Sequence, residues 1–238
     1  MDAIHVLVSL SIFALKEDDG VRDVEMKLRA GIEPFERHAL RYDEWFERNR
    51  AVYEAELLAV KELLPREGRG VEIGVGSGRF GSPLGVRVGI EPSGELRRMA
   101  RRRGIEVVAG VAERLPLRDS SFDYALMVTV LCFVEEPERA VEEVWRILKR
   151  RGVFVVGFID RESPVGRIYE RRKNESVFYR AAHFLSSEEI LDLMKRKGFC
   201  DFKIVQTIFR PPWEVTELEP IKEGYGEGSF VVIRASKS

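Results

Sequence analysis

Short apolar runs and amphipathic segments alternate along most of this chain. Apolar runs of strand length lie at residues 71–73, 86–90, 105–109, 120–134, 153–159, 202–209 and 229–235. Segments with helical spacing of apolar residues, or with helix-capping residues at their ends, lie at 35–46, 51–64, 93–104, 137–149 and 186–198. The alternation predicts an α/β domain in which helices cover a sheet.

The first apolar run leads directly into alternating glycines. Glu72 is followed by Gly74, Gly76 and Gly78, and glycines at such spacing let the backbone turn sharply and allow a ligand to lie against it. Residues 76–81 also fit the dinucleotide pattern G-x-G-x-x-G. Spacing disfavours that alternative, because the next strand begins only five residues after Gly81 and leaves no room for a full helix.

A second acidic residue ends the next predicted strand. Glu91 lies 19 residues beyond Glu72 and is followed by Pro92 and Ser93. A carboxylate at a strand end can accept hydrogen bonds from both hydroxyls of a ribose. The two acids and the glycines together predict a nucleotide-cofactor site.

These motifs resemble those of class I S-adenosylmethionine-dependent methyltransferases over roughly residues 35–152. The matching segments are E-x-G-x-G-x-G from Glu72, G-I-E-P-S from Gly89, G-V-A-E-R-L-P from Gly110 and S-F-D from Ser121. The resemblance implies a three-layer, Rossmann-like α/β fold with a seven-stranded, mostly parallel sheet, an antiparallel last strand and helices on both faces. It further implies one methyltransferase domain over residues 31–238, with residues 160–185 and 210–228 as insertions on the acceptor side.

The resemblance also implies a set of residues that bind S-adenosylmethionine. Glu72 faces the methionine part, Glu91 and Pro92 the ribose, and Ala112 and Glu113 the adenine, while Val128 and Thr129 end the fourth strand beside the cofactor. Gly74, Gly76 and Gly78 form the loop. Val111 stands where the family has an aspartate, so a side-chain contact to the adenine amino group is not expected at that position.

The resemblance implies methyl transfer to a small-molecule acceptor by in-line displacement, for which no metal is expected. The candidate catalytic residues are Tyr42, Glu135 and His183, and further acceptor-side candidates are Arg167, Tyr169, Tyr179 and Arg180. An amine need only arrive neutral, whereas a phenol or an acidic carbon would require a base. The alternatives are a methyltransferase acting on protein or RNA and a non-catalytic module that binds S-adenosylmethionine. Cys132 lacks the Pro-Cys context of a nucleophile and is interpreted as a small buried residue.

Composition narrows the partners and the compartment. The chain has 238 residues, is 45% apolar and carries a formal net charge of -1, so no global field attracts nucleic acid or a membrane. The arginine cluster at residues 97–103 is interpreted as a solvated helix face. Two cysteines fit a cytoplasmic protein. Residues 3–15 are too short to span a bilayer, and residues 1–30 are treated as an extension of unassigned role. Monomer and homodimer both remain open.

Overall fold

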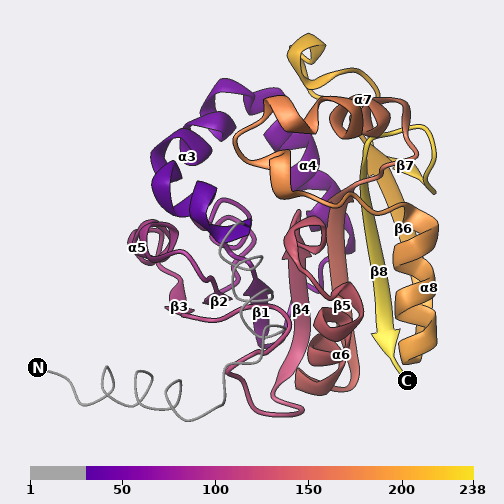
Figure 1. Ribbon diagram of the computed structural model, residues 1–238. Helices are drawn as coiled ribbons and strands as arrows, with labels where there is room; N and C mark the ends of the chain where they lie inside the picture. The colour runs from indigo at the N-terminus through magenta and orange to yellow at the C-terminus, as the bar shows by residue number, and fades with distance from the viewer. Residues whose placement is uncertain (1–30) are drawn as a thin grey trace, which may run out of the picture.

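A computed structural model describes residues 31–238, and the predicted extension over residues 1–30 lies outside the described residues. The strands form one sheet of eight in the order β3-β2-β1-β4-β5-β8-β6-β7 (Figure 1). Their bounds are β1 Gly70–Ile73, β2 Val88–Ile90, β3 Glu106–Val108, β4 Phe122–Val128, β5 Leu148–Ile159, β6 Phe199–Thr207, β7 Lys222–Glu223 and β8 Phe230–Lys237.

The strands from β3 to β5 pair in parallel, and β8 runs antiparallel to both β5 and β6. Ile73 pairs with Ile90 on one side and with Met127 on the other, so β1, β2 and β4 end beside one another. The carboxyl ends of parallel strands form the edge at which open α/β sheets bind ligands. The predicted Rossmann-like fold with an antiparallel last strand is confirmed.

The predicted number of strands, seven, is wrong by one. The additional strand is β7, two residues long, which pairs Lys222 and Glu223 with Gln206 and Val205 of β6. Both β7 residues are exposed and charged, so they belong to no apolar run and to no alternation of apolar and polar residues. Backbone pairing to the open edge of β6 creates this strand, and such pairing leaves no pattern in the sequence.

Helices cover both faces of the sheet, as expected. Their bounds are α3 Ala39–Arg48, α4 Arg50–Leu63, α5 Gly94–Arg102, α6 Pro137–Ile147, α7 Pro164–Arg172 and α8 Ser187–Lys197, with short 3-10 turns η1 Leu131–Phe133, η2 Lys173–Glu175, η3 Tyr179–Ala181 and η4 Pro212–Glu214. α6 and α8 pack together on one face, α4 packs on β5, β6 and β8 on the other, and α5 lies against β3 (Figure 1). α7 lies beyond the carboxyl ends of the parallel strands, above the sheet in the view of Figure 1.

The predicted helix over residues 35–46 is broken at His38. Residues 31–37 are helical, His38 has non-helical backbone angles (φ -120, ψ 29), and α3 begins at Ala39. The parts on either side of the break are held by different partners, since Glu36 bonds to the start of α5 and Asp43 bonds to the glycine loop. Two separate anchors therefore redirect a segment whose apolar spacing alone favours one helix.

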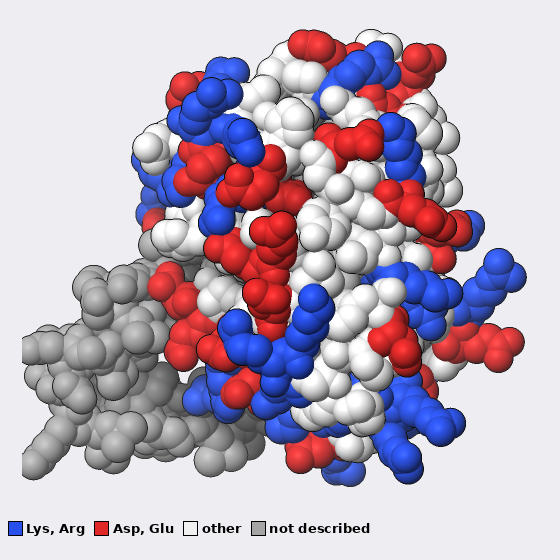
Figure 2. Space-filling model, turned by 90° about the vertical axis from the view of Figure 1, so that its right-hand side faces the viewer, with Lys and Arg blue, Asp and Glu red and all other residues white. Residues whose placement is uncertain are grey.

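One face of the surface carries charges of both signs. On the side of the molecule that lies to the right in Figure 1, acidic and basic side chains are interspersed (Figure 2). Within residues 31–238, no helix combines the length and the apolar character that a membrane crossing requires.

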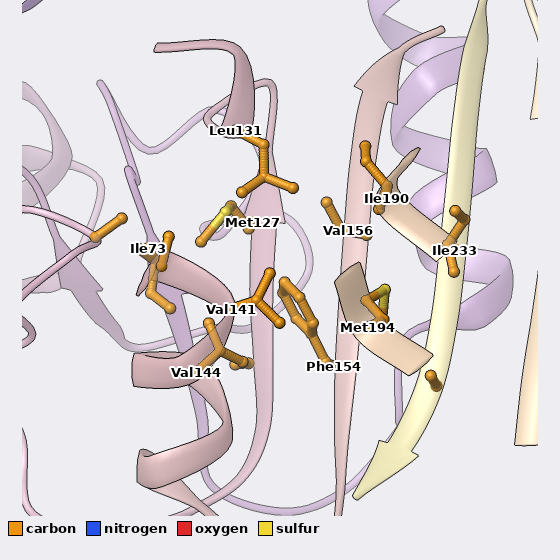
Figure 3. Packing of buried hydrophobic residues seen from close by; sticks show 14 of the residues in the cluster. Ile73, Met127, Leu131, Val141, Val144, Phe154, Val156, Ile190, Met194 and Ile233 are labelled. Atoms are coloured by element: carbon orange, nitrogen blue, oxygen red, sulfur yellow. The ribbon is translucent and has the colours of Figure 1, made fainter. Parts of the chain in front are cut away.

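Two apolar clusters lie on opposite faces of the sheet and fix the strands in place. Figure 3 shows the cluster beneath α6 and α8, where Ile73 of β1, Met127 of β4 and Phe154 of β5 pack against Val144 and Met194 of these helices. The second cluster lies beneath α3 and α4. Burial of this kind contributes roughly 25 cal/mol per Å² of apolar surface, and it holds the strand ends that build the site.

Candidate functional site

A cavity of about 730 Å³ opens at the carboxyl ends of β1, β2 and β4. This volume lies within the range of small-molecule sites, roughly 300 to 1,000 Å³. One side is lined by the glycine loop and the ends of β2 and β4, and the other by aromatic side chains from α3, α7, η3 and η4. The two sides are called here the loop half and the aromatic half.

The glycine loop turns with positive φ angles that favour glycine. Gly74 has φ 68 and Gly76 has φ 54, and the backbone N–H groups of Gly74 and Val75 both donate to the carbonyl of Ile90, at 2.8 and 3.0 Å. A Cβ atom on Gly76 would lie 3.0 Å from the Tyr42 hydroxyl. The absence of side chains at Gly74 and Gly76 leaves bare backbone facing the cavity.

Glu91 is the buried carboxylate of the loop half. It is 5% exposed, and its two oxygens accept hydrogen bonds from the backbone N–H groups of Gly76, at 2.9 Å, and Ser93, at 2.8 Å. Burial raises the pKa of this carboxyl to about 7, although the two backbone hydrogen bonds act in the opposite direction. Each oxygen accepts one bond from the protein and retains a further acceptor site for a ligand.

Asp43 of α3 fastens this helix to the glycine loop. Its carboxylate accepts hydrogen bonds from the Ser77 hydroxyl at 2.6 Å, from Arg79 at 2.8 and 2.7 Å, and from Arg103 at 2.8 Å. Burial opposes ionisation of Asp43, but these hydrogen bonds outweigh it and lower its pKa to about 2. α3 is therefore held across the mouth of the loop half by charged contacts that persist at neutral pH.

The segment before α3 is fastened separately, to the first turn of α5. The carboxylate of Glu36 accepts a hydrogen bond from the Ser93 hydroxyl at 2.6 Å and one from the backbone N–H of Glu95 at 3.2 Å. The Ser93 hydroxyl in turn caps α5 by accepting from the N–H of Leu96. Residues 31–48 thus cover the loop half from two anchor points.

Thr129 follows β4 with a strained backbone. Its φ of 52 lies in the left-handed region, which is unusual for a β-branched residue. The backbone N–H of Thr129 donates to the carbonyl of Gly157 at 2.8 Å, and this bond to β5 helps to hold the conformation. Strain of this kind costs about 1 to 3 kcal/mol and clusters at functional sites. Thr129 lines the cavity together with Val128.

The aromatic half is built from side chains rather than backbone. Tyr169 of α7 and Tyr179 of η3 meet edge to face with ring centroids 5.4 Å apart, and Phe35 packs against Phe178 at 5.2 Å. All four line the cavity. Tyr42 of α3 also reaches Phe178, at 6.0 Å, and joins this half to the loop half.

Comparison with known proteins identifies the family. A family model described as a methyltransferase domain matches residues 71–156. An uncharacterized protein of Methanocaldococcus jannaschii is 45% identical over 85% of this chain and 98% of its own length. A solved structure from Thermotoga maritima, described as a S-adenosylmethionine-dependent methyltransferase and possible histamine N-methyltransferase, is 56% identical with a TM-score of 0.84, covering 87% of this chain and 99% of that one.

The chain belongs to the S-adenosylmethionine-dependent methyltransferases. This membership makes S-adenosylmethionine its cofactor and methyl transfer its activity. An uncharacterized protein of Mycobacterium tuberculosis, 34% identical over 84% of this chain and 72% of its own length, is a more distant relative.

The loop half of this methyltransferase fits a nucleoside cofactor. A Cβ atom would intrude at Gly76, and Glu91 offers free acceptor sites beside it. The predicted cofactor residues that line the cavity are Gly74, Gly76, Glu91, Pro92, Ala112, Glu113, Val128 and Thr129. The donor set therefore suits the ribose and the backbone-facing parts of S-adenosylmethionine.

Two predicted cofactor residues of the methyltransferase lie behind the loop instead of in the cavity lining. Gly78 packs against α5, where a Cβ atom would lie 3.0 Å from Ile105 and 3.3 Å from the Cα of Ala100. Glu72 is 2% exposed and lies against Gly81, and burial raises the pKa of its carboxyl well above the usual range. Both residues shape the loop from behind.

The three candidate catalytic residues of the methyltransferase are separated by the fold. Tyr42 lines the cavity, and burial raises its pKa above the ordinary value of a phenol. Glu135 and His183 are exposed and lie outside the cavity lining. Their backbone N–H groups donate to Glu113 and to the carbonyl of Cys132, so each is held in a loop that borders the cavity without contributing to its lining.

The insertions of the methyltransferase contribute unequally. Tyr169 and Tyr179 line the cavity, whereas Arg167 and Arg180 are exposed and outside its lining. Burial raises the pKa of the Cys132 thiol to about 12, which suits an inert side chain better than a nucleophile. Among residues 31–238, no group of His, Cys, Asp or Glu side chains is arranged to hold a metal ion.

Sequence reasoning missed more than one residue of the aromatic half, among them Phe178 and, within the described part of the chain, the only buried acid in that half, Glu56. It lies on α4, is 9% exposed and lines the cavity. A signal was present, because Glu56 falls among Val52, Ala55 and Ala59 on the apolar face of a helix. A charged residue on such a face is costly unless something compensates it.

Proposed function

We propose that the enzyme methylates a small molecule that binds in the aromatic half of the cavity. One observation carries this proposal: residues suited to the cofactor and aromatic side chains suited to an acceptor line the same cavity of about 730 Å³. The lining of the aromatic half includes Phe35, Tyr42, Tyr169, Phe178 and Tyr179. A space of this size accommodates small ligands, and residues 31–48 are fastened across it.

In the proposed complex, the loop half binds the cofactor. Glu91 accepts hydrogen bonds from the ribose hydroxyls, Gly74 and Gly76 let the backbone approach the ligand, and residues 110–113 face the adenine. The hydrogen bonds from the ribose hydroxyls would use the acceptor sites that Glu91 retains. Glu72 acts indirectly in this proposal, because it supports the loop at Gly81.

For methyl transfer, the protein mainly has to orient the acceptor and exclude water. S-adenosylmethionine supplies a methyl carbon that is already electrophilic. The side chains of the aromatic half hold the acceptor's lone pair at near-attack distance and exclude water. Tyr42 keeps its proton because burial and nearby carboxylates raise its pKa. It therefore serves as a hydrogen-bond donor in the proposed site and not as a base.

The relative from Thermotoga maritima supports a small acceptor. That protein is described as a possible histamine N-methyltransferase, an activity on a small molecule, and it is 56% identical to this chain. From this relative, a small acceptor is inferred for the present enzyme.

Incubation with methyl-labelled cofactor and a metabolite extract tests the proposal. The expected result is label in the small-molecule fraction. Label confined to protein or RNA would contradict it and would favour the alternative of a macromolecular acceptor. Heat-inactivated enzyme provides the background in the same extract.

A further inference from the structure

Glu56 is a carboxylate without a protein partner at the wall of the cavity. It is 9% exposed and lies on the buried face of α4, with Val52, Ala55 and Ala59 around it. Within residues 31–238, no hydrogen bond or ion pair to its carboxylate is formed, and burial alone accounts for its raised pKa of about 8. An unpartnered buried acid costs several kcal/mol when ionised, and a cationic ligand in the cavity would offset this cost.

Three phenols from other elements line the same cavity as Glu56: those of Tyr42 on α3, Tyr169 on α7 and Tyr179 on η3. In the described part of the chain, none of these hydroxyls makes a hydrogen bond to another protein group. Burial is the main cause of the raised pKa of each tyrosine, and the charge of Glu56 adds to it in every case. Four polar groups therefore converge on one space without satisfying one another.

The sign of the buried charge favours a cation in that space. Among the described residues that line the cavity, the buried charged side chains are both acidic, Glu56 and Glu91. Glu91 already accepts two hydrogen bonds. Lys173 lines the cavity but pairs with Glu170 at 2.6 Å. The other basic side chains of the lining are exposed to solvent: Arg41, Arg48 and Arg172. This imbalance among the buried groups contrasts with the mixed charge on the face of the molecule that Figure 2 shows.

Aromatic faces add to the same preference. Tyr169 and Tyr179 line the cavity together with Glu56, and a cation over a tyrosine ring is attracted by its quadrupole. An ammonium ion stabilises the ionised form of Glu56. An anionic acceptor would repel that form, and a neutral acceptor would not stabilise it.

We infer that the acceptor is an amine that enters as an ammonium ion, and that Glu56 is the residue that binds this ammonium and sets the specificity. The ammonium would pass one proton to the Glu56 carboxylate before transfer, which leaves a neutral amine with a free lone pair; its new bond to the methyl carbon would form as the carbon–sulfur bond of the cofactor breaks. The inference rests on the proposed function, because it places the ammonium in the acceptor half of the methyltransferase cavity. A carboxylate paired with an ammonium forms a charge-assisted hydrogen bond, and the tyrosine hydroxyls supply further partners.

The variant Glu56→Gln tests the inference, since it keeps the shape of the side chain and removes the charge. Enzyme, methyl-labelled cofactor and a metabolite extract are incubated, and the labelled small products are separated on a cation exchanger at acidic pH. The wild type is expected to label products that the exchanger retains. Glu56→Gln is expected to label them at a rate lower by about ten- to a hundredfold at limiting acceptor, the range for a hydrogen bond to a charged group.

Matched controls separate a binding role from a structural one. Glu62→Gln makes the same chemical change at an exposed position of α4 and is expected to label at the wild-type rate. Calorimetric affinity for S-adenosylhomocysteine is expected to be equal in all three proteins, which would show that the loop half is intact. Glu56→Asp keeps the charge and is expected to recover part of the labelling.

The outcomes that would overturn the inference are distinct from failure of the proposed function. Labelled small products that pass the cation exchanger, or full labelling by Glu56→Gln, would remove Glu56 as the ammonium site while leaving a small acceptor in place. Label confined to macromolecules would overturn the proposed function and this inference together.

Discussion

The two halves of the cavity differ in whether their buried carboxyl group is already hydrogen-bonded within the protein. The loop half is lined largely by backbone, and its buried carboxylate Glu91 accepts hydrogen bonds from the N–H groups of Gly76 and Ser93. In the aromatic half, side chains from α3, α4, α7 and η3 converge, and Glu56 has no partner within residues 31–238. The loop half is preorganised without its ligand, whereas the aromatic half retains groups that only a ligand can satisfy.

This difference has an energetic side. A buried acid without a partner lowers the stability of the folded chain, and such costs are tolerated where activity requires them. The strained backbone of Thr129 adds a second cost, at the end of β4. Stability and function should therefore respond in opposite directions to changes in the aromatic half, and in the same direction in the loop half.

The largest expected effect is on stability, at Glu56. Its folded pKa of about 8 lies above the ordinary value near 4.3, so between these values the folded chain binds a proton that the unfolded chain has released. The free energy of unfolding of the wild type therefore falls as pH rises through this window. We expect Glu56→Gln to stabilise the protein by about 2 to 3 kcal/mol at pH 7, and by much less near pH 5.

Chemical denaturation at several pH values measures this effect. Glu62→Gln, at an exposed position of the same helix, should leave the curve of stability against pH unchanged. A gain at Glu56 that does not grow with pH would contradict the assignment of Glu56 as an unpartnered buried acid.

The next effect concerns the loop half, at Glu91. Replacement by alanine removes the proposed ribose contacts and the acceptors for two backbone N–H groups. We expect Glu91→Ala to weaken binding of S-adenosylhomocysteine by about 1.5 to 3 kcal/mol, as for hydrogen bonds to a charged group, and to lower stability as well. Glu91→Gln, which keeps one acceptor oxygen, should lie between. Calorimetry that finds unchanged affinity in Glu91→Ala would remove this residue from the cofactor site.

A smaller effect is expected at Gly76. Alanine there costs about 1 to 2 kcal/mol of backbone strain, and its Cβ atom would lie 3.0 Å from the Tyr42 hydroxyl. Gly85→Ala is a matched control, because Gly85 also has a positive φ, of 78, but open space around its Cβ position. Both variants should lose stability, Gly76→Ala the more because of the contact with Tyr42, and only Gly76→Ala should bind S-adenosylhomocysteine more weakly. Equal affinities would show that the bare loop does not contact the cofactor.

The smallest effect is expected at Tyr42, where the two halves meet. As a hydrogen-bond donor it contributes about 0.5 to 1.5 kcal/mol, so Tyr42→Phe should slow methyl transfer by about tenfold or less. A general base would be worth roughly a hundred- to ten-thousandfold. Steady-state rates with the labelled acceptor fraction distinguish these roles, and a loss beyond a hundredfold would make Tyr42 a base.

The site residues that the sequence predicted are those whose role depends on a short stretch of chain. Glycines at 74 and 76 and an acid at 91 are required wherever a strand end must expose its backbone and hold a ribose, so a short segment of sequence displays the whole requirement. The same local logic marked the strands through their apolar runs. It failed for β7, because the pairing of Lys222 and Glu223 with β6 depends on an edge made far away in the chain.

By itself, the sequence determined the α/β fold, the family and most of the cofactor side, since each follows from the order of residues within a few turns or strands. Tertiary structure decided that Glu135 and His183 lie outside the cavity lining, that Gly78 and Glu72 lie behind the loop, and that Glu56 lines the same cavity as Tyr169 and Tyr179. The reason is physical. Whether a buried charge has a partner depends on side chains brought together from separate helices, and spacing along one helix carries no information about the others.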